Sequence, residues 1–148
     1  VTAVDINPKA IESARENANR YNVKVNCLLG DLFEPCEKFA YDNIFWNVPF
    51  EGEEDIQLPE RMCQFKNAIL DPGHKLLARY IDEAGEYLVP ETGRLWLIFS
   101  PEIGNEKFLV EVSRRNGLQP KRVSRSEMLK ENGEFWISMV LYGFEKIE

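Results

Sequence analysis

The sequence predicts an α/β fold with a mostly parallel sheet and one antiparallel strand near the C-terminus. Three observations indicate this fold. Strand-like and helix-like segments alternate along most of the chain, which is typical of parallel strands joined by helices. Residues 41–46 and 94–100 are nearly continuous apolar runs, as expected of strands covered on both faces. The last two strand-like segments have no helix between them, so we expect them to pair in opposite directions.

The first part of the chain is predicted to form a strand, a helix and two further strands. A β-branched run over residues 1–6 precedes Asn7 and Pro8, a capping residue and a proline that suits the first helical turn. The segment 24–29 is the next apolar strand, and 41–46 is the third. Pro49 cannot donate a ladder hydrogen bond, so it marks the end of that strand.

The remaining segments continue the alternation and then depart from it. Residues 51–73 form a long, acidic loop, with a short helix expected around 61–70. The elements expected after it are a helix over 76–88, a strand over 94–100, a helix over 105–116 and strands over 118–124 and 134–144.

Composition limits the possible classes of protein. The 148 residues are enough for a single domain spanning 1–148, and the formal net charge of −7 argues against strong non-specific binding to nucleic acid. No apolar run is long enough to cross a membrane, and no signal peptide is visible. Three cysteines without metal-type spacing and the single histidine, His74, predict neither a disulfide framework nor a metal site. This usage is typical of a cytoplasmic protein.

Polar side chains follow three of the predicted strands. Asp5 ends the first, Asp31 follows the second and Asn47 ends the third. Open α/β sheets bind ligands outside the carboxyl ends of their strands. The sequence therefore predicts a ligand site at this edge.

Three stretches at these strand ends resemble motifs of class I S-adenosylmethionine-dependent methyltransferases: Val4-Asp5-Ile6-Asn7-Pro8, Gly30-Asp31-Leu32-Phe33 and Asn47-Val48-Pro49-Phe50. The last is similar to the Asn-Pro-Pro-Tyr/Phe motif of the branch that includes the small methyltransferase domain, release-factor glutamine methyltransferases and methyltransferases of adenine and guanine exocyclic amines. The resemblance implies a Rossmann-like sheet and runs from the family's second strand to its seventh. Val48 replaces a proline of the motif, and the family's first strand and glycine-rich loop have no counterpart.

The resemblance assigns cofactor contacts to five residues. It implies that Asp5 accepts hydrogen bonds from the ribose hydroxyls of S-adenosyl-L-methionine, and that Ile6 packs either on the adenine or in the core. Asp31 is expected to accept from the adenine amine and the Leu32 N–H to donate to the ring, with Asn47 close to the cofactor. The alternatives are that Asp5 bonds to the following helix's N-terminus and that Asp31 bonds to its own turn.

The resemblance also makes the tetrapeptide catalytic. The side-chain carbonyl of Asn47 and the backbone carbonyl of Val48 could accept the two N–H bonds of a planar NH₂ group, while Phe50 stacks on it and Pro49 shapes the loop. Catalysis is then positioning plus electrostatics, with no metal. The alternative is a strand-end turn with Asn47 as a cap and Phe50 in the core.

The function predicted is therefore N-methylation of a planar amide or exocyclic amine, in a protein glutamine or a nucleic-acid base. Net charge favours a protein acceptor over RNA or DNA. The alternatives are a catalytically inactive methyltransferase-like binding module and an NAD-dependent Rossmann dehydrogenase. Because the chain begins at Val1 in mid-strand, we expect it to be part of a longer protein. Without the glycine-rich loop, this piece is expected to be inactive and to bind the cofactor poorly.

Overall fold

The computed structural model describes residues 1–49, 70–102, 104–129 and 135–147. The loop expected over 51–73 and the helix expected around 61–70 therefore lie almost wholly outside the described residues. The elements in chain order are β1 (Thr2–Asp5), α1 (Pro8–Arg20), β2 (Asn26–Leu29), β3 (Asn43–Asn47), the short 3₁₀ helix η2 (Pro72–His74), α3 (Lys75–Ala84), β4 (Arg94–Phe99), α4 (Glu106–Arg115), β5 (Leu118–Leu129) and β6 (Phe135–Lys146).

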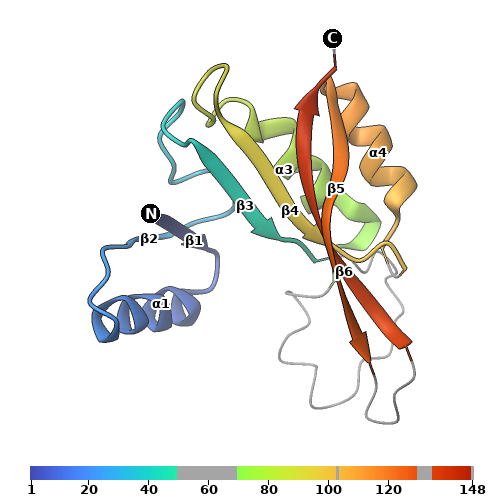
Figure 1. Ribbon diagram of the computed structural model, residues 1–148. Coiled ribbons are helices and arrows are strands. Elements are labelled where there is room, and N and C mark those ends of the chain that lie inside the picture. Colours follow the sequence, from blue (N-terminus) through green and yellow to red (C-terminus); the bar gives the residue numbers. More distant parts are fainter. Residues whose placement is uncertain (50–69, 103, 130–134, 148) are drawn as a thin grey trace.

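The described strands form two sheets rather than the one continuous sheet that we expected. β1 and β2 pair in parallel, and β3, β4, β6 and β5 form a four-stranded sheet in that order. Figure 1 shows the β1–β2 pair with α1 lying beside the larger sheet, on the side of β3. Among the described residues, β1 pairs with β2 alone and β3 pairs with β4 alone, so no strand joins the two sheets.

The strand directions confirm the predicted fold class. β1 runs parallel to β2, and β3 runs parallel to β4. β6 runs antiparallel to both of its neighbours, β4 and β5, which makes it the reversed strand expected near the C-terminus. β5 and β6 are longer than predicted, because each strand supplies the hydrogen-bond partners that extend the other.

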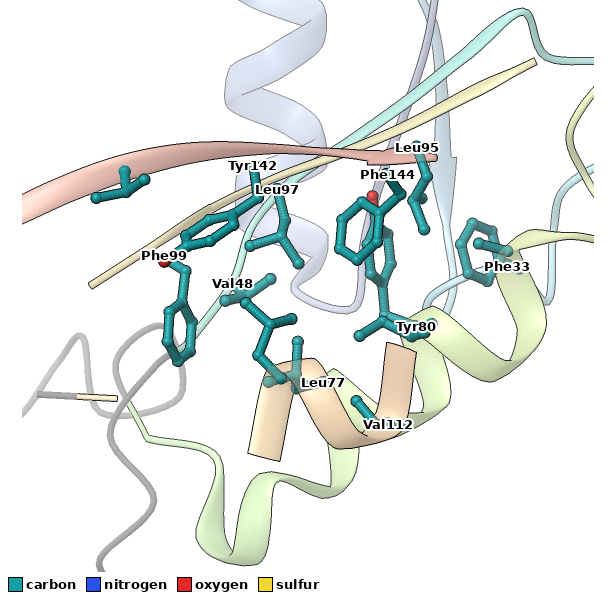
Figure 2. Close-up of a cluster of buried hydrophobic side chains, with 14 residues drawn as sticks. Phe33, Val48, Leu77, Tyr80, Leu95, Leu97, Phe99, Val112, Tyr142 and Phe144 are labelled. Carbon is teal, nitrogen blue, oxygen red and sulfur yellow. The ribbon is translucent and has the colours of Figure 1, made fainter. Parts of the chain in front are cut away.

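The core lies on one face of the four-stranded sheet (Figure 2). Side chains from alternate positions of β4 and β6 meet the apolar stripes of α3 and α4, as the period-two and helical patterns require. Each fully buried aliphatic side chain of this kind stabilises the fold by about 1.5–3 kcal/mol. The members that are at most 2% exposed are Val48, Leu77, Tyr80, Ile81, Ala84, Leu97, Phe99, Leu109, Val112, Val140 and Tyr142.

The prediction that β4 is covered on both faces is wrong. Leu95, Leu97 and Phe99 are buried, whereas Trp96 and Ile98 on the opposite face are only partly buried. On the neighbouring strand, Phe45 is 57% exposed. The reason is that α3 and α4 lie on the same side of this sheet (Figure 1).

The helix starts follow local chemistry that is visible in the sequence. The Asn7 side chain accepts from the Lys9 N–H at 3.0 Å, and Pro8 occupies the first turn of α1. Asn105 caps α4 in the same way, accepting from the Phe108 N–H at 3.0 Å. No helix in the described part of the chain is long and apolar enough to cross a membrane.

The start of α3 uses a buried acid. Both carboxylate oxygens of Asp71 accept backbone N–H groups, from Leu76 and Leu77, each at 2.9 Å. Gly73 and His74 both adopt positive φ, at 69° and 54°, which lets the chain turn back so that Asp71 can reach the helix. α3 ends at Ala84, before the Leu88 that the apolar stripe had suggested.

Candidate functional site

Three predicted site residues lie at the carboxyl ends of strands. Asp5 is the last residue of β1 and is in register with Leu29, the last residue of β2. Asp31 follows two residues after β2, so the two acids lie at the same end of the β1–β2 pair. Asn47 is the last residue of β3, in the other sheet, and its side chain is exposed. These positions are those at which α/β sheets bind ligands.

Asp5 is held by its own turn and retains one oxygen without a described donor. Its Oδ1 accepts a hydrogen bond from the Asn7 N–H at 2.7 Å. This is the kind of contact expected if Asp5 bonds to the start of the following helix. Within the described residues no donor is recorded for Oδ2 of this exposed side chain. The hydrogen bond fixes the orientation of the carboxylate and leaves an acceptor at the end of the strand.

Ile6, directly after Asp5, does not join the core. Its side chain is 67% exposed, which excludes the core role that remained open from the sequence. A large aliphatic side chain beside an acid at a strand end provides an apolar surface for a planar ring.

The turn after β2 is held tightly. Gly30 has no room for a Cβ, which would lie 2.7 Å from the Pro35 ring, and Leu32 adopts a φ of 47°. Phe33 is buried and stacks on Tyr80 and Tyr87, with ring centroids 5.7 and 4.7 Å away. A left-handed residue that is not glycine costs about 1–2 kcal/mol, and such strain is often found at functional sites.

Asp31 bonds to a helix rather than to its own turn. Its Oδ2 accepts from Nη1 of Arg79 in α3 at 2.7 Å, in a half-buried ion pair. The same Arg79 donates through Nε to Glu83, at 3.2 Å. The hydrogen bonds that Arg79 donates to the Asp31 and Glu83 carboxylates raise the pKa of Arg79 above its ordinary value. The described contacts therefore do not support the alternative in which the Asp31 side chain satisfies its own backbone.

The tetrapeptide that begins with the last residue of β3 is anchored by its middle residues. The Val48 side chain is 1% exposed, and its N–H donates to the Ile98 carbonyl at 3.4 Å. Pro49 is also buried. The anchoring holds in place the end of β3, whose last residue is the exposed Asn47. Phe50, the predicted stacking residue, lies outside the described residues.

α3 connects the two strand-end regions, and sequence reasoning missed this role. Besides the ion pair of Arg79 with Asp31, the Tyr80 ring lies 5.0 Å from the Trp46 ring, and its hydroxyl donates to the Trp96 carbonyl at 2.7 Å. Burial raises the pKa of Tyr80. In the sequence, the spacing of Arg79 predicts an ion pair only with Glu83, which lies four residues later on the same helix face.

A second polar cluster, also missed from the sequence, lies at the carboxyl end of β4. Glu102 accepts from the Ser138 hydroxyl at 2.5 Å, from Ser100 at 3.3 Å and from Arg125 at 3.0 Å. Both serines are fully buried. Burial raises the pKa of the Glu102 carboxyl, but hydrogen bonds led by Ser138 outweigh it and hold the pKa below its usual value. This cluster ties the loop after β4 to β5 and β6.

The basic cluster of β5 is occupied by ion pairs. Lys121 pairs with Glu145, Arg122 with Glu106 at 2.6 Å, and Arg125 with Glu102 at 3.0 Å. Cations that are already paired with carboxylates contribute little to a positive surface for phosphates. The nucleic-acid role considered for this cluster therefore gains no support from the described contacts.

His74 lies at the start of α3 and packs on an aromatic ring. Its ring centroid is 5.2 Å from that of Phe108, an arrangement typical of a structural histidine. Within the described residues no group of three or more His, Cys, Asp or Glu side chains gathers in a way that could hold a metal ion.

Comparison with known proteins gives consistent matches. The family model described as Methyltransferase small domain matches residues 1–139. The chain is 35% identical to a release factor glutamine methyltransferase of Bordetella pertussis, over 66% of this chain and 37% of the relative. It is 32% identical to one of Geobacter sulfurreducens, over 79% of this chain and 42% of the relative. The chain therefore spans about two fifths of the length of these relatives.

An archaeal relative and two solved structures extend the comparison. A putative protein N5-glutamine methyltransferase of Methanocaldococcus jannaschii is 32% identical, over 78% of this chain and 62% of the relative. A methyltransferase structure from Pyrococcus furiosus superposes with a TM-score of 0.67 at 19% identity, covering 99% of this chain and 63% of that one. TYW2 of M. jannaschii, solved with AdoMet, gives 0.57 at 18% identity, covering 99% and 58%. These two likenesses show the fold.

Proposed function

The chain belongs to the Methyltransferase small domain family, and we propose that it provides part of the catalytic domain of an S-adenosylmethionine-dependent N-methyltransferase. The acceptor we propose is a planar NH₂ group, with a protein glutamine favoured over a nucleic-acid base. The observation that carries the proposal is the placement of Asp5, Asp31 and Asn47 at the carboxyl ends of three strands in a chain of this family.

The residues at the ends of β1 and β2 suit S-adenosylmethionine. The exposed Asp5 carboxylate has an oxygen that can accept from vicinal ribose hydroxyls, and the uncovered Ile6 side chain offers an apolar face to adenine. Asp31, held through one oxygen by Arg79, can accept the adenine amine through the other. When bound, the cofactor supplies a methyl group on a sulfonium sulfur.

Asn47 and Val48 would orient the acceptor. An amide or aryl-amine nitrogen is a weak nucleophile because its lone pair is delocalised into the neighbouring π system. Carbonyl oxygens that accept hydrogen bonds from both of its N–H groups draw electron density toward the nitrogen and hold the planar group in one orientation. The exposed Asn47 amide has such an oxygen, Val48 would add its backbone carbonyl, and Phe50 is proposed to stack on the planar group.

Two observations favour a protein acceptor. The three relatives found by sequence similarity are named as glutamine methyltransferases. The net charge of −7 and the ion pairing of Lys121, Arg122 and Arg125 both disfavour a polyphosphate partner. The acidic loop over 51–60, which lies outside the described residues, would add attraction for a peptide with lysine or arginine beside its glutamine.

The test is methyl transfer by the full-length protein to a glutamine peptide flanked by basic residues, and to single-stranded RNA and DNA. We expect Asn47→Ala to lower kcat by about 10²- to 10³-fold, because one of the two oriented acceptors is lost. Its melting temperature should stay close to that of the wild type, since the side chain is exposed.

The matched control is Asn43→Ala at the other end of β3, which should keep near-normal kcat. Asn43 is also exposed but lies at the amino end of the strand, where its Oδ1 accepts from the Trp96 indole at 2.9 Å. An Asn47→Ala protein with wild-type kcat would contradict the catalytic role. Transfer to RNA or DNA but not to the peptide would reverse the acceptor preference.

A further inference from the structure

The ion pair between Arg79 and Asp31 joins two parts of the molecule that are not joined by a sheet ladder. Asp31 follows β2, in the two-stranded sheet, and Arg79 lies on α3, which covers the four-stranded sheet. Figure 1 shows the two-stranded sheet beside the β3 side of the four-stranded sheet. The contact between them holds Asp31, the residue that the proposed function assigns to the adenine of the cofactor.

The geometry of Arg79 suits the task of fixing the direction of a carboxylate. Its Nη1 donates to Oδ2 of Asp31 at 2.7 Å, while its Nε donates to Oε1 of Glu83 at 3.2 Å. Because the guanidinium is planar, holding it at two edges sets the plane in which it meets Asp31. Asp31 is thereby held through one oxygen, and its Oδ1 retains acceptor capacity within the described residues.

Stability alone is a poor account of this pair. The side chains of Arg79 and Asp31 are 39% and 31% exposed, and ion pairs between partly exposed groups contribute little to folding. The same loop is also held by the buried Phe33, stacked against Tyr80 and Tyr87. Apolar packing of Phe33 already holds the turn in place, so the ion pair mainly sets the orientation of the Asp31 carboxylate.

We propose that Arg79 is a positioning residue that aims the Asp31 carboxylate at the exocyclic amine of the cofactor's adenine. This inference rests on the proposed function, because it takes Asp31 as the acceptor of that amine. Arg79 itself need not touch the cofactor. Its effect is to make the protein prefer a purine with an amine at this position over one with a carbonyl oxygen.

The chain contains a matched control pair. Lys38 and Glu86 form an ion pair at 2.5 Å that also ties the β2–β3 connection to the end of α3. Its members are 58% and 60% exposed, and within the described residues neither forms a hydrogen bond or ion pair with Asp31. If Arg79 acted only as a tie between the two segments, removing Lys38 should have a comparable effect.

The experiment measures dissociation constants by calorimetry on the full-length protein, with S-adenosylhomocysteine and S-inosylhomocysteine, which carries an oxygen in place of the amine. We expect Arg79→Gln to weaken binding of the adenosine compound about tenfold, as for a lost charge-assisted contact. Binding of the inosine compound should change by less than about twofold, because it has no amine to donate. Lys38→Gln should leave both values near wild type.

Two further variants separate positioning from a folding defect. Arg79→Lys, which keeps the charge but not the planar fork, should recover only part of the discrimination. Asp31→Asn combined with Arg79→Gln should lose no more than Asp31→Asn alone, since both act through one contact. Melting temperatures of all variants check that the fold is retained.

The outcomes are distinguishable. Equal weakening of both compounds by Arg79→Gln, or equal losses in Arg79→Gln and Lys38→Gln, would overturn the positioning role and leave the proposed function standing. A wild-type protein that binds neither compound would overturn the proposed function and this inference together.

Discussion

At the scale of single residues, buried polar groups have the largest consequences. Asp71 is 1% exposed and accepts two backbone N–H groups at the start of α3. A helix start leaves such donors without intrahelical partners, and a buried donor that loses its acceptor carries its full desolvation penalty. The acid therefore determines whether α3 can begin at this position.

We expect Asp71→Ala to lower the free energy of unfolding by about 2–3 kcal/mol, because it removes both acceptors from a buried site. Asp42→Ala, a change of the same type at an exposed position beside β3, should have little effect. Urea denaturation of the two variants checks the difference. Equal losses would show that the Asp71 carboxylate does not cap α3.

Sequence reasoning at this scale succeeded where a residue acts on its neighbours. Asn7, Pro8 and Asn105 were recognisable as helix starts because capping chemistry acts over three residues or fewer. The partners of Asp31 and Glu102 were not foreseen. Arg79 is 48 positions away from Asp31, and Ser138 is 36 positions away from Glu102, and no local pattern records such distances.

At the scale of elements, the two faces of β3 and β4 have unequal burial. In the register of this pair, Leu97 lies beside Trp46 and Phe45 lies beside Trp96. Leu97 is fully buried against α3 and α4, whereas Phe45 on the other face is 57% exposed. A near-continuous apolar run such as that of β4 therefore does not predict that the two faces of the strand are equally buried.

We expect Leu97→Ala to cost about 2–5 kcal/mol, from lost burial and the cavity left behind. Phe45→Ala, although it removes a larger side chain, should cost under about 1 kcal/mol, because most of its surface is exposed in the folded state. Chemical denaturation compares the two. A larger loss at Phe45 would mean that the outer face of β3 is covered in solution.

The Glu106 carboxylate ties the last three elements together. Glu106 at the start of α4 accepts from Arg122 of β5, at 2.7 and 2.6 Å, and from the Tyr142 hydroxyl of β6 at 2.5 Å. Burial raises the pKa of Glu106, but the hydrogen bonds from Arg122 and Tyr142 outweigh it and leave the pKa below 4.5. Burial and the bond to Glu106 raise the pKa of Tyr142 to about 12.

The lowered pKa of Glu106 predicts a direction of pH dependence. Stability from a carboxyl whose pKa is depressed in the folded state is fully present above the unfolded value near 4.5 and is lost as the pH falls through the folded value. We expect the melting temperature of Glu106→Gln to fall less than that of the wild type between pH 5 and pH 3. Glu111→Gln, exposed on the same helix, serves as the control. Parallel curves for Glu106→Gln and the wild type would contradict this assignment.

At the scale of the whole molecule, α3 is the element on which the candidate site depends. It supplies core residues to the four-stranded sheet, and through Arg79 and Tyr80 it also contacts the turn after β2 and Trp46 near the end of β3. The acids and the amide of the candidate site lie on different sheets. Their relative placement therefore depends on side chains of a helix, because no strand ladder connects them within the described residues.

The sequence by itself determined the order of elements, the reversed strand near the C-terminus and the positions of Asp5, Asp31 and Asn47 at strand ends. These features follow from apolar periodicity, caps and proline placement, all of which are local in the chain. Only the tertiary structure decided that the described strands divide into two sheets, that one face of β4 is less covered and that Arg79 holds Asp31. Those outcomes depend on which distant segments meet, and a hydrophobic pattern states that a face must be buried without stating what buries it.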